Sequence, residues 1–128
     1  MPIETLDHVN VKTSRLKEMI DWYGRVLGLQ TGKRPNFSMN GAWLYIGDLP
    51  AIHLVEVARE PAAEDPKLEH FALGAKGMKD FLQVLEANAV AYSIDPVPGF
   101  PIVQVNLHDP DGNHIHVDFS TDEDETAT

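Results

Sequence analysis

The sequence contains an internal repeat, and this repeat limits the possible folds more than any other feature does. The segment LDHVNV at 6–11 aligns with LEHFAL at 68–73, and the same offset aligns LKEMI at 16–20 with MKDFL at 78–82. A chain of 128 residues that repeats itself in this way is expected to fold as two copies of one supersecondary unit.

Four histidines occupy equivalent positions in the two copies. His8 corresponds to His70 in the alignment above. With one inserted residue, the segment IHL aligns with IHV, so that His53 corresponds to His116. Because two-fold symmetry would bring equivalent positions together, we expect these four imidazoles to serve a single divalent metal ion.

Hydrophobic periodicity predicts the order strand, helix and three further strands in each copy. The first copy has predicted strands at 3–12, 29–34, 41–47 and 51–58 and a helix that is capped by Thr13 or Ser14 and ends at Gly28. The second has predicted strands at 68–75, 91–95, 101–108 and 113–119 and a helix at 77–89. The predicted fold class is therefore α+β, with two tandem βαβββ modules.

The length and composition favour one domain over 1–128, and its parts can be placed on the sequence. We expect module one at about 3–58, a linker rich in proline and charge at 59–67, module two at about 68–119 and an acidic tail at 120–128.

Composition also excludes several kinds of protein. There is no cysteine, so a metal site must use nitrogen and oxygen ligands. The formal net charge of −10 argues against a nucleic-acid partner, because such binding needs basic side chains. No apolar stretch reaches membrane-spanning length and the N-terminus does not resemble a signal peptide. These features predict a cytoplasmic protein without a membrane partner.

Strand alternation separates a polar face from an apolar face, because residues two apart on a strand point the same way. His53 alternates with Leu54, and His116 alternates with Ile115. Four further polar side chains share the histidine face in this pattern: His8, Asn10, Gln104 and Asn106. Alternation alone does not distinguish a solvent face from a polar cavity. The repeated histidines favour the cavity, so Gln104 and Asn106 are candidates for substrate binding.

Three more residues are candidates for substrate binding. Trp43 and Tyr45 share one face of the predicted strand at 41–47, and Arg34 precedes this strand. Arginine can hold a carboxylate or phosphate through its planar fork. In the alternative interpretation, the two aromatic side chains belong to the core or to a dimer interface and Arg34 is a surface charge.

Four segments, LDHVNV, AIHLVEV, LEHFAL and DPDGNHIHVDF, give the chain a resemblance to the vicinal oxygen chelate superfamily, which includes glyoxalase I, bleomycin-resistance proteins and extradiol dioxygenases. The resemblance spans roughly residues 3–119. It implies that the two modules curl into a cup of mixed β-sheet around a metal. It also places His8, His53, His70 and His116 at the ligand positions.

The chain departs from this family at His116, where metal-dependent members usually carry glutamate, and at His53, where relatives often carry Glu or Gln. Imidazole ligands suit Zn, Ni, Co or Fe better than Mg or Ca. The resemblance implies a lyase, isomerase or ring-cleaving dioxygenase whose small substrate chelates the ion through two oxygens. The alternative is a non-catalytic protein that sequesters a drug, like the bleomycin-resistance proteins.

Two further expectations concern ligands and assembly. His114 shares a face with His116 and could be an extra ligand, although a residue so close to a turn is more often at the surface. Single-domain relatives of this type usually pair, so a homodimer is expected. The modules could then complete a site within one chain or across the dimer.

Overall fold

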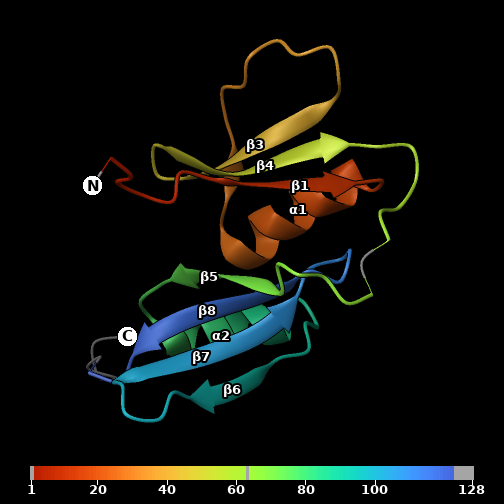
Figure 1. The fold of residues 1–128 in the computed structure, drawn as a ribbon. Coiled ribbons are helices and arrows are strands. Elements are labelled where there is room, and N and C mark those ends of the chain that lie inside the picture. Colours follow the sequence, from red (N-terminus) through yellow and green to blue (C-terminus); the bar gives the residue numbers. More distant parts are fainter. Residues whose placement is uncertain (1, 63, 123–128) are drawn as a thin grey trace. The chain divides into compact units, whose positions relative to one another are not determined.

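The computed structural model describes residues 2–62 and 64–122. The chain divides into two compact units, Met1–Ala63 and Glu64–Thr128. Each unit has one helix and one four-stranded mixed sheet, in the order β, α, β, β, β (Figure 1). The predicted α+β fold with tandem βαβββ modules is confirmed.

Unit 1 consists of β1 (Val9–Thr13), α1 (Leu16–Leu27), β2 (Gln30–Thr31), β3 (Gly41–Ile46) and β4 (Leu49–Glu56). Its sheet has the order β1-β4-β3-β2, in which only the β1–β4 pair is parallel.

Unit 2 consists of β5 (His70–Gly74), α2 (Met78–Ala87), β6 (Ser93–Pro96), β7 (Ile102–His108) and β8 (His114–Ser120). Its sheet has the order β5-β8-β7-β6, in which only the β5–β8 pair is parallel. The predicted tail at 120–128 begins at the last residue of β8, and residues 123–128 lie outside the described part of the chain.

The two sheets repeat the same pairing register. Asn10 lies opposite His53 in unit 1, and Ala72 lies opposite His116 in unit 2. On the other side of each histidine strand, Trp43 pairs with His53. The equivalent partner of His116 is Asn106 of β7. Residues that align between the two sequence copies therefore occupy equivalent positions in the two sheets.

Each helix covers the apolar face of its own sheet (Figure 1). In unit 1 the buried face of α1 contributes Met19 and Tyr23, which are both fully buried. In unit 2, Leu85 of α2 is fully buried and Phe81 contacts the ring of Phe119 at 5.7 Å between centroids. Leu54 and Ile115 are likewise fully buried, which confirms the predicted apolar face and turns their neighbours His53 and His116 to the opposite face.

The predicted N-terminal cap of the first helix is wrong. Thr13 ends β1, and its Oγ1 accepts a hydrogen bond from the backbone N–H of Arg15 at 2.9 Å. Arg15 occupies the cap position without a side-chain cap. The predicted C-terminus is correct, because Gly28 has φ 72° and a left-handed conformation that suits glycine.

Several strand boundaries also differ from the predictions by two or more residues, and two of these differences lie near His8 and Pro50. Residues 3–8 form no strand, because the β1–β4 ladder begins only at Val9; His8 therefore precedes the strand. The expected break at Asp48-Leu49-Pro50 is a two-residue turn at 47–48, and Pro50 lies within β4 next to a register shift in the β3–β4 ladder. Such an irregularity accommodates a proline that cannot donate to the ladder.

Candidate functional site

In unit 1, three rings form a stack on the face of the sheet opposite α1. The rings of His8 and His53 lie 3.8 Å apart with an interplanar angle of 10°. Trp43 lies on His53 at 4.0 Å and 11°. The cross-strand register explains the second contact, since Trp43 and His53 are directly opposite each other.

In unit 2, the equivalent histidines form an equivalent stack. The rings of His70 and His116 lie 3.9 Å apart with an interplanar angle of 14°. The two pairs are thus alike in sequence position and in ring geometry, and the second histidines, His53 and His116, are alike in strand register. An imidazole nitrogen binds a metal in the plane of its ring, so these parallel rings would have to turn out of the stack to bind one ion.

An acidic residue orients the first histidine of each pair. Nδ1 of His8 donates to Asp7 Oδ2 at 2.7 Å, and Nδ1 of His70 donates to Glu69 Oε1 at 2.8 Å. A carboxylate on one ring nitrogen fixes the tautomer and leaves the other nitrogen, here Nε2, free to bind a metal. Neither acid was predicted from the sequence, although each directly precedes its histidine in the repeated segment.

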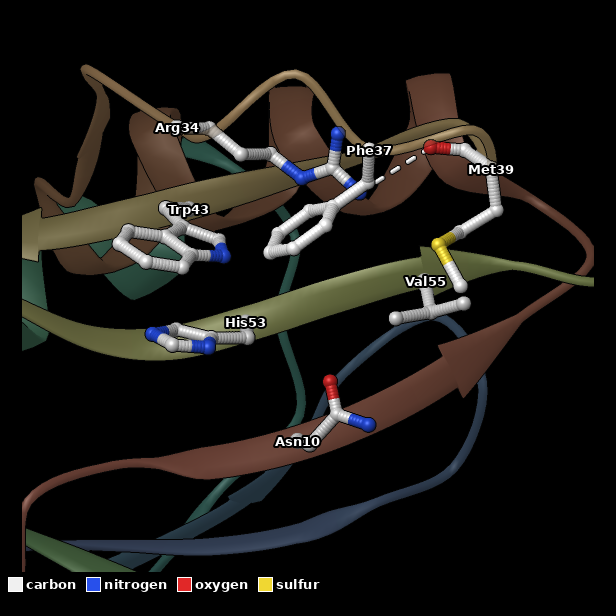
Figure 2. A pocket seen from close by; sticks show the side chains of 7 residues that line it. All are labelled: Asn10, Arg34, Phe37, Met39, Trp43, His53 and Val55. Atoms are coloured by element: carbon white, nitrogen blue, oxygen red, sulfur yellow. Dashed lines mark hydrogen bonds between the residues drawn. The ribbon is translucent and has the colours of Figure 1, made fainter.

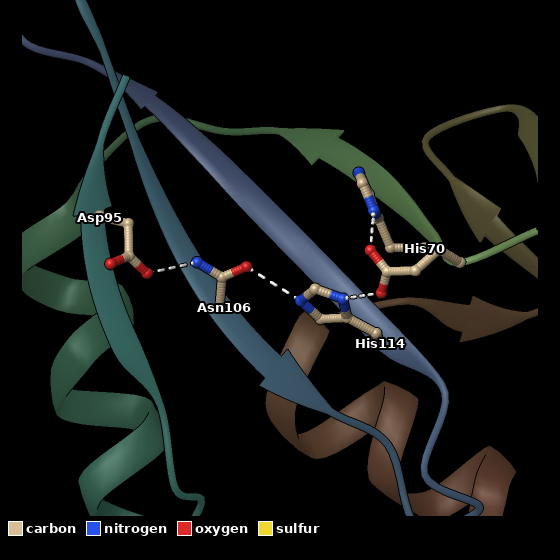
Figure 3. Close-up of polar contacts among 5 residues, drawn as sticks. His70, Asp95, Asn106 and His114 are labelled. Carbon is tan, nitrogen blue, oxygen red and sulfur yellow. Dashed lines mark hydrogen bonds and ion pairs between the residues drawn. The ribbon is translucent and has the colours of Figure 1, made fainter. Parts of the chain in front are cut away.

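Glu69 also binds His114. This histidine begins a chain of hydrogen bonds across the sheet of unit 2 (Figure 3). Nδ1 of His114 contacts Glu69 Oε2 at 2.5 Å, and Nε2 of His114 lies 2.9 Å from Asn106 Oδ1. The amide of Asn106 then donates to Asp95 at 2.7 Å. The hydrogen bonds from His114 and His70 lower the pKa of Glu69 to about 2, which keeps it an acceptor.

Three histidines of unit 2 lie close enough to hold a metal ion. His70, His114 and His116 each offer one nitrogen within 4.8 Å of the others. His114 has both ring nitrogens engaged, by Glu69 and by Asn106, so it could bind an ion only by giving up one of these contacts. His70 and His116 are therefore the better-prepared ligands.

His116 combines burial with a ring nitrogen to which no described residue binds. It is buried, and its Nδ1 is buried without a hydrogen-bond partner among the described residues. Such an orphaned polar atom is costly unless a further group binds it. Burial, followed by the nearby His70 and His114, lowers the pKa of His116. The imidazole is thus kept in the neutral form that a metal requires.

His53 is prepared in a comparable way. Its Nε2 donates to the carbonyl oxygen of Pro50 at 3.0 Å, so that Nδ1 is the nitrogen left for a ligand. Burial and the neighbouring His8 lower its pKa. That His8 and His53 bind the same ion as His70 and His116 stays a prediction.

A pocket of about 200 Å³ lies beside the stack of unit 1 (Figure 2). Apolar side chains form most of its wall, with Arg34 as its one charged residue apart from the imidazole. Its lining residues are Asn10, Arg34, Phe37, Met39, Trp43, His53 and Val55. Phe37 and Met39 were not predicted from the sequence. They lie in an irregular loop, which has no alternation of apolar and polar residues that would place them beside the pocket.

The proposed substrate residues occupy different surroundings. Arg34 and Trp43 line the pocket. The hydroxyl of Tyr45 donates to the carbonyl of Lys33 at 2.6 Å, a contact within its own unit. Gln104 and Asn106 lie half-buried on β7, where Asn106 belongs to the His114 chain. The substrate roles of all five residues stay predictions.

Comparison with known proteins agrees with this fold. Residues 5–117 match the model of the Glyoxalase/Bleomycin resistance protein/Dioxygenase superfamily. The chain is 31% identical over 124 residues to Glyoxylase I 4 of Arabidopsis thaliana, in an alignment that covers 90% of this chain and 70% of that protein.

Two solved structures share the fold. A glyoxalase-family protein of Bacillus anthracis has a TM-score of 0.77 and 23% identity, covering 92% of this chain and 96% of that one. TnmS3, an antibiotic binding protein from Streptomyces sp. CB03234, has a TM-score of 0.69 and 18% identity, covering 94% and 98%. Neither helix in the described part of the chain is long and apolar enough to cross a membrane. The chain belongs to the Glyoxalase/Bleomycin resistance protein/Dioxygenase superfamily.

Proposed function

We propose that this protein is an enzyme that depends on a divalent transition metal and acts on a small substrate through two adjacent oxygens. The observation that carries the proposal is the pair of equivalent stacks, His8 with His53 and His70 with His116, at 3.8 and 3.9 Å. Both pairs repeat the same sequence position and ring geometry, and the first ring of each pair is hydrogen-bonded to a carboxylate.

The residues fit a metal of the later transition series. All four proposed ligands are imidazoles, and the buried, unpartnered Nδ1 of His116 is suited to a further bond. Neutral nitrogen donors favour Zn, Ni, Co or Fe over Mg or Ca. When bound, such an ion would polarise the substrate oxygens and stabilise negative charge that develops on them.

The chain's own residues would orient the ligands and the substrate. Asp7 and Glu69 hold the rings of His8 and His70 by their Nδ1 atoms. Trp43 supports His53 by stacking. We propose lyase, isomerase or ring-cleaving dioxygenase activity, in accord with the 31% identity to a glyoxalase I relative.

The test is elemental analysis of protein purified without added metal, followed by removal of the metal and reloading with Zn, Ni, Co or Fe(II). The proposal expects one ion per chain and a turnover, measured with hemithioacetal and catechol substrates, that disappears on chelation and returns on reloading. Protein that takes up none of these metals, although it is folded by circular dichroism, would refute it.

A non-catalytic, drug-sequestering role is the second candidate. The mostly apolar pocket of unit 1 favours it, since such a pocket can bind a ligand without a metal. The fold is also shared with TnmS3, an antibiotic binding protein. Tight ligand binding by metal-free protein, with no turnover in any metal-loaded form, would favour this role over the enzyme.

We also propose that the protein is a homodimer. Each sheet has terminal strands with an open edge within its own unit, and exposed apolar side chains on these sheets include Ile46, Leu49 and Ile94. Sedimentation tests the dimer. If sites are shared between chains, mixing His8→Ala with His70→Ala chains after reversible dissociation would restore metal binding; if each chain supplies its own site, it would not.

A further inference from the structure

The pocket of unit 1 contains a cation, Arg34, that no described residue neutralises. Arg34 makes no ion pair with any described residue, although the chain carries 20 acidic side chains and only 10 lysines and arginines. Its Nε is buried and has no hydrogen-bond partner among the described residues. An unsatisfied, buried donor on a charged group indicates that a further acceptor belongs there.

The guanidinium group is nevertheless held in a defined position. Its Nη2 donates to the carbonyl of Met39 at 3.1 Å, and its Cζ lies 4.9 Å from the ring centroid of Phe37. Gly41 leaves room for it, since a Cβ at that position would lie 2.8 Å from Nη2. The group is thus fixed by one carbonyl and one ring while part of its fork stays available.

The rest of the pocket is suited to a flat apolar group. Trp43 presents an indole between His53, at 4.0 Å, and Phe37, at 6.4 Å and a tilt of 49°. Met39 and Val55 complete the apolar wall. The volume of about 200 Å³ is comparable to the roughly 150 Å³ cavity that holds benzene in another protein, so one ring with a small substituent would fit.

We infer that this pocket binds the aromatic carboxylate portion of the ligand, with the carboxylate on Arg34 and the ring against Trp43. A carboxylate matches the planar fork of arginine, and an aromatic face matches the indole. The inference rests on the proposed function in that it names a substrate class for the same site. The pocket itself requires only residues of unit 1.

The experiment titrates metal-free protein with benzoate and with benzamide, its uncharged analogue of nearly the same shape. Tryptophan emission follows binding, because the chain has only two tryptophans and Trp22 is buried on α1. We expect benzoate to change the emission saturably and to bind at least about tenfold more tightly than benzamide, since a hydrogen bond to a charged group contributes about 1.5–3 kcal/mol. Trp43→Phe should remove the emission change.

Substitutions of Arg34 test the anchor. Arg34→Met should bind benzoate no better than benzamide, and Arg34→Lys should recover part of the difference because it keeps the charge but lacks the fork. Arg59→Met is the matched control, because Arg59 is exposed and lies outside the pocket. It removes the same charge and should leave benzoate binding unchanged.

Equal binding of benzoate and benzamide by the wild type, or unchanged benzoate affinity in folded Arg34→Met, would overturn the inference. Metal-free protein separates this outcome from failure of the proposed function. If benzoate binds through Arg34 but no metal is ever taken up, the enzyme proposal fails and the ligand class stands. If metal binds but benzoate does not, the ligand class fails alone.

Discussion

Unit 1 and unit 2 carry the same pair of stacked histidines, but the side chains beside the two pairs are opposite in character. Opposite His53 on the neighbouring strand stands Trp43, whereas opposite His116 stands Asn106. Two residues beyond each histidine on the same strand face, unit 1 has Val55 and unit 2 has Asp118. The shared part is thus the histidine pair, and the differing part is what surrounds it.

The histidine pairs and the side chains around them differ in how far the two units have kept them alike. The histidine pairs survive in both copies, as expected if both serve one chemical task. The surroundings have diverged into an apolar wall in unit 1 and a hydrogen-bonded polar set in unit 2, as expected if they contact different parts of a ligand. The chain would then recognise a ligand with one apolar and one polar portion.

The largest effect is expected on the free energy of unfolding, for a side chain on the buried face of β4, the strand that carries His53. Leu54→Ala should lower the free energy of unfolding by about 2–5 kcal/mol, because it removes a fully buried side chain next to His53 and leaves a cavity. Urea unfolding followed by tryptophan emission measures it, since both tryptophans belong to unit 1. A loss below 1 kcal/mol would contradict the assigned core.

The acids that orient the histidines should have a smaller effect, and an unequal one. Glu69 holds two imidazoles, whereas Asp7 holds one and is 78% exposed. We expect Glu69→Gln to weaken metal binding by roughly 10- to 100-fold, the usual range for such outer partners, and Asp7→Asn to weaken it less. Competition with a chromophoric chelator gives the affinities.

Glu86→Gln is the matched control for Glu69→Gln, because the carboxylate of this exposed acid accepts a hydrogen bond from Tyr92 and is bonded to none of the four histidines. It should leave the metal affinity unchanged. Equal losses for Asp7→Asn and Glu69→Gln would break the predicted difference between the two units.

Tyr45 should have the smallest effect. Tyr45→Phe removes the hydrogen bond to the carbonyl of Lys33 and should cost about 0.5–1.5 kcal/mol of stability. The side chain of Gln104 makes no such bond to the described backbone, so Gln104→Ala is expected to change ligand binding more than stability. Thermal melts and ligand titrations of both variants measure this; a larger melting shift for Gln104→Ala would contradict it.

The repeat and the strand periodicity were sufficient to predict the fold class and the faces on which the histidines lie. They depend on local spacing, which the sequence displays directly. Contacts between distant residues left no such pattern: Glu69 meets His114 across the β5–β8 pair, 45 positions away. The position of Phe37 beside Arg34 depends on an irregular loop, and the helix cap at Arg15 depends on how Thr13 ends the preceding strand.

We have proposed that both histidine pairs hold the same ion, and the metal content of single variants shows whether they do. His8→Ala, His53→Ala, His70→Ala and His116→Ala would be purified beside His108→Ala, whose histidine is exposed at the end of β7, and analysed by mass spectrometry for metal per chain. The account predicts one ion in the wild type and in His108→Ala, and a loss in all four other variants with the fold intact by circular dichroism. Full occupancy in folded His8→Ala and His70→Ala would contradict it.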